Sequence, residues 1–143
     1  MAREGASAGN GRGGRRVIVV DASAILAAIL GETGGDRVFD HLDDALVSSV
    51  NVAEVYTYAT VNRLPVSAID AFFTETGINV VAFDHAQAVL TGQLADITRK
   101  SGLSLGDRSC LALAKLQAAE VLTVDRAWQR FSGALGLTVT LLR

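Results

Sequence analysis

Short apolar runs alternate along the chain with longer stretches in which apolar residues recur at helical spacing. The clearest run is 17–20, four consecutive branched residues that indicate a strand buried on both faces. Between Val52 and Ala59, apolar residues recur at intervals of three and four, which is typical of one face of a helix. By the same criteria we expect strands at 17–20, 45–48, 78–83, 120–124 and 138–142, and helices at 23–30, 36–42, 49–63, 67–77, 86–100, from 104 to about 114, and around Trp128 and Phe131.

This alternation of strands and helices is typical of α/β proteins. It predicts a three-layer α/β/α fold with a mostly parallel, four- to five-stranded sheet. The chain has 143 residues, half of them apolar and a fifth charged, which fits a single domain with a well-filled core. Residues 1–16 are rich in Gly and Arg and have no apolar period, so we expect a flexible tail followed by one domain over 17–143.

Composition limits where the protein acts. No apolar run approaches the roughly 20 residues of a membrane span, so we expect no membrane association through a transmembrane helix. Cys110 is the only cysteine, which excludes an intramolecular disulfide and is typical of the cytoplasm. The net charge of −2 neither favours nor excludes a polyanionic substrate.

Four acidic residues follow strands or begin helices. Asp21 and Asp125 come at the carboxyl ends of apolar strands, and Glu54 and Asp107 lie in the first turns of helices. In a parallel sheet these positions meet at one edge, so we expect the four carboxylates to converge. Such a cluster requires a hard cation, and oxygen-only ligation favours Mg²⁺ or Mn²⁺. Sites of this kind serve phosphodiester hydrolysis.

Each acid also has an ordinary structural interpretation. Asp21 would serve equally well as a helix cap, and Ser23 is placed to cap the helix that follows the first strand. This interpretation has to be made separately for each of four acids that belong to the same edge of the sheet. The four acids together therefore favour a metal site. Two arginines next to these acids, Arg108 and Arg126, are candidates for contacts to substrate phosphate.

The chain resembles the PIN-domain ribonucleases, and especially the VapC-type toxins of bacterial and archaeal toxin–antitoxin pairs. The resemblance extends from about residue 17 to 142, and four motifs carry it: Val-Asp21-Ala-Ser23-Ala, Val-Ala-Glu54-Val, Leu-Ser-Leu-Gly-Asp107 and Leu-Thr-Val-Asp125-Arg126. It implies a PIN-like fold and a metal-dependent endoribonuclease whose four matching acids hold one or two Mg²⁺ or Mn²⁺ ions.

The resemblance also implies supporting residues and partners. The hydroxyls of Ser23 and Thr123 would support the acidic cluster from the second shell. The partners would be an RNA substrate, a second copy of the chain in a homodimer, and a small cognate antitoxin of the VapB type that covers the cleft. The apolar helices around Tyr56, Tyr58 and Phe72-Phe73 are candidates for that protein interface, although core packing explains several of these residues as well.

Two other functions remain open at this point. A phosphatase or phosphotransferase would use Asp21 as a nucleophile, but haloacid-dehalogenase-like enzymes need a second Asp two residues later, where this chain has Ser23. A non-catalytic binding module would keep the fold and use the cleft only to capture a partner. Such a module has no need to retain all four acids.

Overall fold

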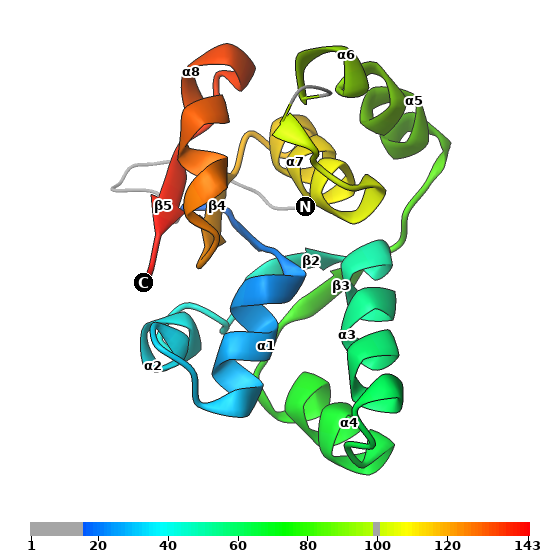
Figure 1. Cartoon of the computed structure of the whole chain (residues 1–143), viewed down its shortest axis with the longest axis vertical. Coiled ribbons are helices and arrows are strands. Elements are labelled where there is room, and N and C mark those ends of the chain that lie inside the picture. Colours follow the sequence, from blue (N-terminus) through cyan, green and yellow to red (C-terminus); the bar gives the residue numbers. More distant parts are fainter. Residues whose placement is uncertain (1–15, 99–100) are drawn as a thin grey trace.

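Five parallel strands form one sheet at the centre of the molecule. The computed structural model describes residues 16–98 and 101–143. The strand order is β3-β2-β1-β4-β5, and each neighbouring pair is parallel. Figure 1 shows helices on both sides of this sheet. The strands are β1 (Ile18–Val20), β2 (Leu46–Ser48), β3 (Asn79–Val81), β4 (Glu120–Thr123) and β5 (Val139–Leu141).

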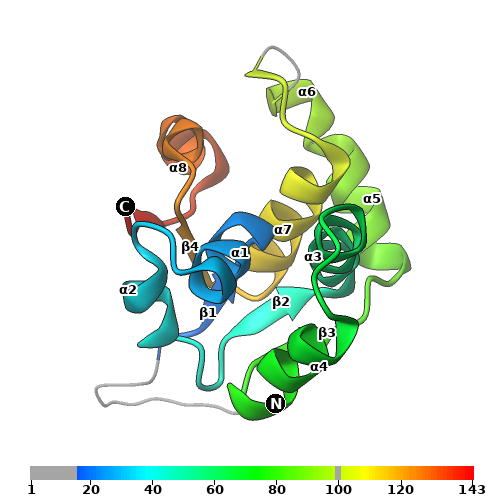
Figure 2. The ribbon, with the colours of Figure 1, turned by 60° about the horizontal axis from the view of Figure 1, so that its bottom comes forward.

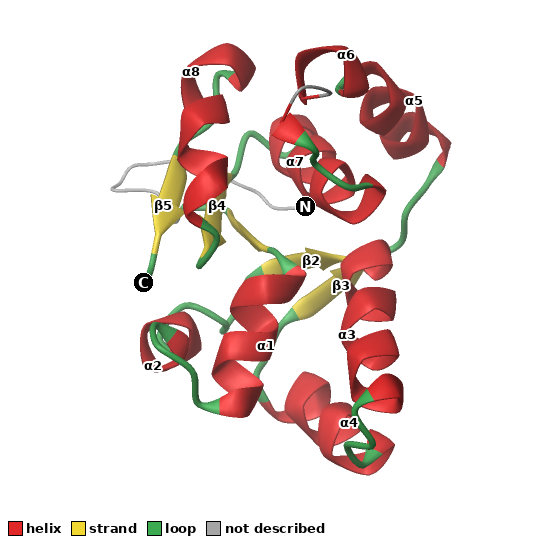
Figure 3. Cartoon of the chain, viewed as in Figure 1, coloured by secondary structure: helices red, strands yellow, loops and turns green. Residues whose placement is uncertain are grey.

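The helices divide into two groups, one on each face of the sheet (Figure 3). One face carries α1 (Ala22–Leu30), α2 (Gly35–Phe39), α3 (Ser49–Val61) and α4 (Val66–Glu75). The other carries α5 (His85–Gln93), α6 (Ala95–Thr98), α7 (Leu105–Leu116), the 3₁₀ helix η2 (Arg126–Phe131) and α8 (Ser132–Leu135). The predicted three-layer α/β/α fold with a parallel sheet is therefore confirmed, with five strands.

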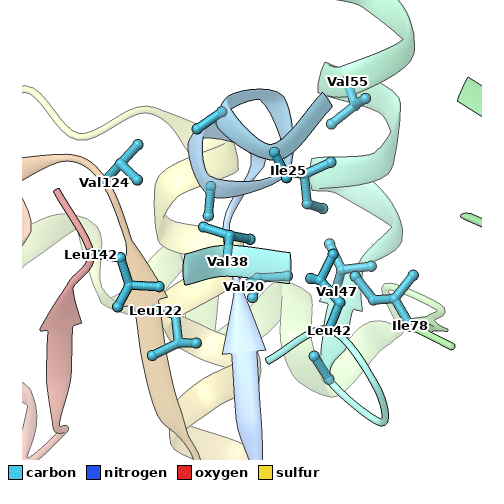
Figure 4. Packing of buried hydrophobic residues seen from close by; sticks show 14 of the residues in the cluster. Val20, Ile25, Val38, Leu42, Val47, Val55, Ile78, Leu122, Val124 and Leu142 are labelled. Carbon is cyan, nitrogen blue, oxygen red and sulfur yellow. The ribbon is translucent and has the colours of Figure 1, made fainter. Parts of the chain in front are cut away.

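Two apolar clusters fill the space between the layers. Adjacent residues of a strand face opposite clusters. Val20 and Leu122 lie in the first cluster, which is under α1–α4, and Val19 and Val121 lie in the second cluster, which is under α7. Figure 4 shows the first cluster around Val20. This packing explains why β1 is apolar at every position.

The helix expected over 86–100 is interrupted at Leu94. This side chain is buried in the second cluster, and its carbonyl oxygen accepts hydrogen bonds from the N–H groups of both Ile97 (3.2 Å) and Thr98 (3.1 Å). The shared acceptor tightens the turn and separates α5 from α6. The expected end of this helix at Lys100 lies outside the described residues.

The first helix uses one of the two N-caps that the sequence offered. Asp21, and not Ser23, is the N-cap of α1, and its Oδ1 accepts the N–H of Ala24 at 2.8 Å. Asp21 has an extended backbone (φ −93°, ψ 173°), which is the conformation that an N-cap requires. Ser23 lies inside the first turn, where its hydroxyl donates to Asp21. The end of α1 at Gly31, in the left-handed conformation with φ 69°, agrees with the prediction.

The predicted flexible tail lies outside the described residues, except for Arg16. The Arg16 guanidinium forms an ion pair with Glu120 at the start of β4, and Glu120 also accepts a hydrogen bond from Thr140 in β5. In the described part of the chain, every helix is too short or too polar to cross a bilayer.

Candidate active site

Asp21 lies at the carboxyl end of the central strand and is almost completely buried, with 3% of its surface exposed. Three donors reach its carboxylate: Thr123 Oγ1 donates to Oδ2 at 2.7 Å, Ala24 N–H donates to Oδ1 at 2.8 Å, and the Ser23 hydroxyl lies 2.9 Å from both oxygens. Burial raises the pKa of Asp21 to about 6, although these hydrogen bonds oppose the shift. The negative charge of Asp107 adds to the increase.

Thr123 connects Asp21 to Asp125. Its side chain is fully buried at the end of β4, and Oγ1 accepts the backbone N–H of Asp125 at 3.0 Å while it donates to Asp21. Thr123 and Ser23, the two hydroxyls implied as supports, both lie against the Asp21 carboxylate. The loop after β4 is thereby tied to the end of β1.

Glu54 is half-buried on α3, and two residues confine its carboxylate. The side-chain amide of Asn51 donates to Glu54 Oε1 at 2.7 Å. A Cβ added at Gly106 of α7 would lie 2.3 Å from Glu54 Oε2, so the carboxylate packs directly against the glycine backbone. Burial raises the pKa of Glu54, the hydrogen bond from Asn51 lowers it, and the charge of Asp107 raises it.

Asp107 closes the capping box that begins α7. Its Oδ2 accepts the N–H of Ser104 at 3.0 Å, and Ser104 Oγ accepts the N–H of Asp107 at 3.1 Å. The charge of Asp107 raises the pKa of both Asp21 and Glu54. One turn further along α7, burial raises the pKa of the Cys110 thiol, and the charges of all three acids raise it further. Asp107 thus lies within electrostatic range of both Asp21 and Glu54, and all three acids act on Cys110.

These three acids come from elements that meet at one end of the sheet. α3 contacts α1 and α7, and α7 contacts β1 (Figure 2). Glu54 of α3 lies directly against Gly106, in the first turn of α7. The convergence of strand ends and helix starts follows from parallel strand order.

Asp125 follows Val124 at the carboxyl end of β4. Its side chain is exposed, caps η2 by accepting the N–H of Ala127 at 3.0 Å, and lines a pocket of about 510 Å³. Ser23 lines the same pocket, so the pocket begins beside Asp21. The other lining residues are Leu26, Leu30, Glu32, Tyr58, Val124, Arg126 and Arg143.

The donor chemistry of these acids fits a hard divalent cation. Among the described residues, Glu54 Oε2 and Asp107 Oδ1 accept no hydrogen bond. Glu54 and Asp107 therefore each have one carboxylate oxygen available to bind an ion. No three acid, His or Cys side chains in 16–98 and 101–143 stand close enough to form a ready metal-binding group. The oxygens are of the right kind, and a bound ion would have to draw them together.

The two predicted phosphate contacts lie in different surroundings. Arg108 is half-buried, and its Nη1 donates to the carbonyl oxygen of Thr91 at 2.9 Å, which joins α7 to α5. Arg126 is exposed and lines the pocket beside Asp125. Sequence reasoning missed Asn51 and Arg143. The i, i+3 spacing of Asn51 and Glu54 was a usable signal on a helix, whereas only the fold brings Arg143 to the pocket.

The fold is shared with toxin–antitoxin proteins of known structure. A chain of a toxin–antitoxin complex from Klebsiella pneumoniae is 18% identical, with 88% of this chain and 98% of that chain covered and a TM-score of 0.69. VapBC2 from Rickettsia felis, bound to a DNA fragment from its promoter, is 15% identical over 89% and 99%, with a TM-score of 0.70. Mycobacterium tuberculosis VapC20, described as a Sarcin-Ricin loop cleaving toxin, is 18% identical over 82% and 94%, with a TM-score of 0.63.

At these identities the likeness concerns the fold. Among the curated proteins, no sequence matches the chain. The family model of the PIN domain matches residues 18–134, most of the chain. The chain therefore belongs to the PIN domain family.

Proposed function

We propose that this protein is a metal-dependent endoribonuclease that hydrolyses RNA phosphodiester bonds and acts as the toxin of a toxin–antitoxin pair. One observation carries the proposal: Asp21 is buried at the end of the central strand of a PIN domain, and the charge of Asp107 acts on both Asp21 and Glu54. The similarity to VapC20, described as a Sarcin-Ricin loop cleaving toxin, supports RNA as the substrate class.

In this proposal, Asp21, Glu54, Asp107 and Asp125 would hold one or two Mg²⁺ or Mn²⁺ ions. Such ions neutralise charge that develops on the phosphate and make water more acidic. Ser23 and Thr123 keep the Asp21 carboxylate in one orientation through their hydrogen bonds.

The pocket beside Asp125 supplies the substrate contacts in this proposal. Arg126 and Arg143 line it, and neither guanidinium has an ion-pair or hydrogen-bond partner among the described residues. We assign phosphate binding to these two residues, because arginines pair readily with phosphate. Arg108 is a weaker candidate, since it already donates to Thr91.

The partners follow from the same family. The VapBC complexes among the similar structures support a small cognate antitoxin for this chain, and we also propose a homodimer that acts in the cytoplasm. Tyr58, a candidate for the protein interface, is 37% exposed and lines the pocket. Phe72 and Phe73 are partly buried against the first apolar cluster, so core packing accounts for much of their surface.

A nucleophilic role for Asp21 is less well supported. The position two residues later, where a haloacid-dehalogenase-like site needs a second Asp, is Ser23, whose hydroxyl donates to the Asp21 carboxylate. A phosphoaspartate at Asp21 would establish the phosphatase alternative. Full retention of partner binding without any cleavage would establish the binding-module alternative.

The test is cleavage of a mixed RNA pool with Mg²⁺, with Mn²⁺ and with a chelator. We expect cleavage only with a metal, and we expect Asp21→Asn to reduce the rate by at least a hundredfold because it removes a metal-binding charge. Asp84→Asn is the matched control, because Asp84 caps α5 in the same way that Asp21 caps α1. Equal cleavage by wild type and Asp21→Asn would refute the proposal.

A further inference from the structure

The side chain of Asn51 connects α3 to α7 next to Glu54. It is 1% exposed, and its Nδ2 donates to Glu54 Oε1 at 2.7 Å and to the carbonyl oxygen of Gly106 at 3.0 Å. Both hydrogens of the amide are therefore used, one on a candidate metal-binding carboxylate and one on the first turn of the helix that carries Asp107.

We propose that Asn51 is a positioning residue that holds the Glu54 carboxylate against Gly106, in the first turn of the helix that carries Asp107, so that Glu54 can serve as a ligand of a divalent cation. This inference rests on the proposed function. Asn51 does not itself touch substrate or metal. It acts through Glu54, in the way that hydrogen-bonding partners orient metal ligands in other proteins.

The orientation of the amide follows from its neighbours. Glu54 Oε1 and the Gly106 carbonyl oxygen are both acceptors, so only the nitrogen of the amide can face them. Asn51 Oδ1 is buried and has no hydrogen-bond partner among the described residues. An apolar side chain of similar size would avoid this unpaired oxygen, so the two donors distinguish Asn51 from a packing residue.

Gly106 confines the carboxylate from the opposite side. A Cβ at this position would lie 2.3 Å from Glu54 Oε2 and 2.4 Å from the carboxylate carbon. The carboxylate is therefore held between the Asn51 amide and the glycine backbone. A substitution at Gly106 would displace the carboxylate without changing any charge or removing its hydrogen-bond donor.

The test measures Mn²⁺ affinity by electron paramagnetic resonance on metal-free full-length protein, with melting temperature as the check of folding. We expect Asn51→Leu and Gly106→Ala each to weaken Mn²⁺ binding by about 10- to 100-fold. We also expect raised Mn²⁺ concentration to restore RNA cleavage by Asn51→Leu. Asn62→Leu is the control, because Asn62 is the exposed C-cap of the same helix and its side chain donates to the carbonyl oxygen of Tyr58, away from Glu54.

The possible results separate the two proposals. If wild type binds Mn²⁺ and Asn51→Leu binds it equally well with only a lower melting temperature, Asn51 is purely structural and the inference is wrong. If Asn51→Leu does not fold, the Mn²⁺ affinity of Gly106→Ala decides in the same way. If wild type neither binds Mn²⁺ nor cleaves RNA, the proposed function fails, and this inference fails with it.

Discussion

Asp21 has two roles at the residue scale, since it is both the N-cap of α1 and the most buried acid of the site. Its hydrogen bonds from Ser23, Ala24 and Thr123 favour the ionised form, but burial opposes ionisation more strongly. The folded metal-free protein is therefore less stable with Asp21 ionised than with Asp21 protonated. A divalent cation would remove this penalty, because it compensates the buried charge.

This conflict predicts a pH dependence of stability. The pKa of Asp21 rises from 3.8 to about 6 on folding, so the folded state binds more protons between these values, and its stability falls as pH rises through them. The full shift corresponds to about 3 kcal/mol, on the order of 1.4 kcal/mol per pKa unit. We expect urea unfolding of metal-free Asp21→Asn to lack this fall, so that the variant gains stability over wild type from pH 4 to pH 7.

At each pH, the difference in unfolding free energy between wild type and Asp21→Asn removes the contribution of other titrating groups, because both proteins share them. Asp84→Asn, which alters an exposed cap, should follow the wild-type pH profile. A constant difference between Asp21→Asn and wild type across this range would show that burial does not raise the pKa of Asp21.

At the scale of elements, close approaches between helices depend on glycine. Gly106 allows α7 to approach Glu54 of α3, and Gly35 allows the start of α2 to approach α1. A Cβ at Gly35 would lie 2.3 Å from the carbonyl oxygen of Ala27, a backbone atom that cannot move without disturbing α1. Helix α1 is thus fixed by its cap at one end and by α2 along its side.

This contact predicts that Gly35→Ala destabilises the protein by about 1–3 kcal/mol, because it overpacks the α1–α2 contact. Gly92→Ala in α5 is the control: no atom lies within 4 Å of its added Cβ, and the change should stabilise by roughly 0.5–1 kcal/mol through helix propensity. Chemical denaturation of both variants measures the difference. Equal effects of the two substitutions would contradict the contact.

At the scale of the whole molecule, strands of the one sheet contribute side chains to both apolar clusters. Each central strand contributes neighbouring residues to opposite clusters, as Val19 and Val20 do, so neither cluster can be lost while the sheet remains intact. The protein should therefore unfold in one cooperative step.

Trp128, the only tryptophan, allows a test of this cooperativity. It is fully buried in the cluster under α7, whereas Val55 lies in the cluster on the other face of the sheet. We expect Trp128 fluorescence and far-UV circular dichroism to give the same denaturation midpoint. We also expect Val55→Ala to lower both midpoints equally, and separate midpoints would mean that the two faces unfold independently.

Much of the fold was predictable because its signals are local. Apolar runs and helical periods depend on neighbours within a few residues, so the strands and the parallel three-layer arrangement followed from the sequence. The sequence left open whether Asp21 or Ser23 caps α1, because the choice depends on where the strand ends and on which side chain reaches the N–H of Ala24. The break at Leu94, where one carbonyl oxygen accepts two N–H groups, was missed because the apolar spacing gives no sign of it.

The sequence by itself determined that Asp21, Glu54, Asp107 and Asp125 belong to one edge of the sheet, because parallel strand order alone brings strand ends and helix starts together. Only the tertiary structure decided how they differ. It groups Asp21, Glu54 and Asp107 around the start of α7 and turns Asp125 toward the pocket. It also holds Glu54 between Asn51 and Gly106, residues 55 positions apart. Contacts between distant segments depend on packing, and packing has no local signal.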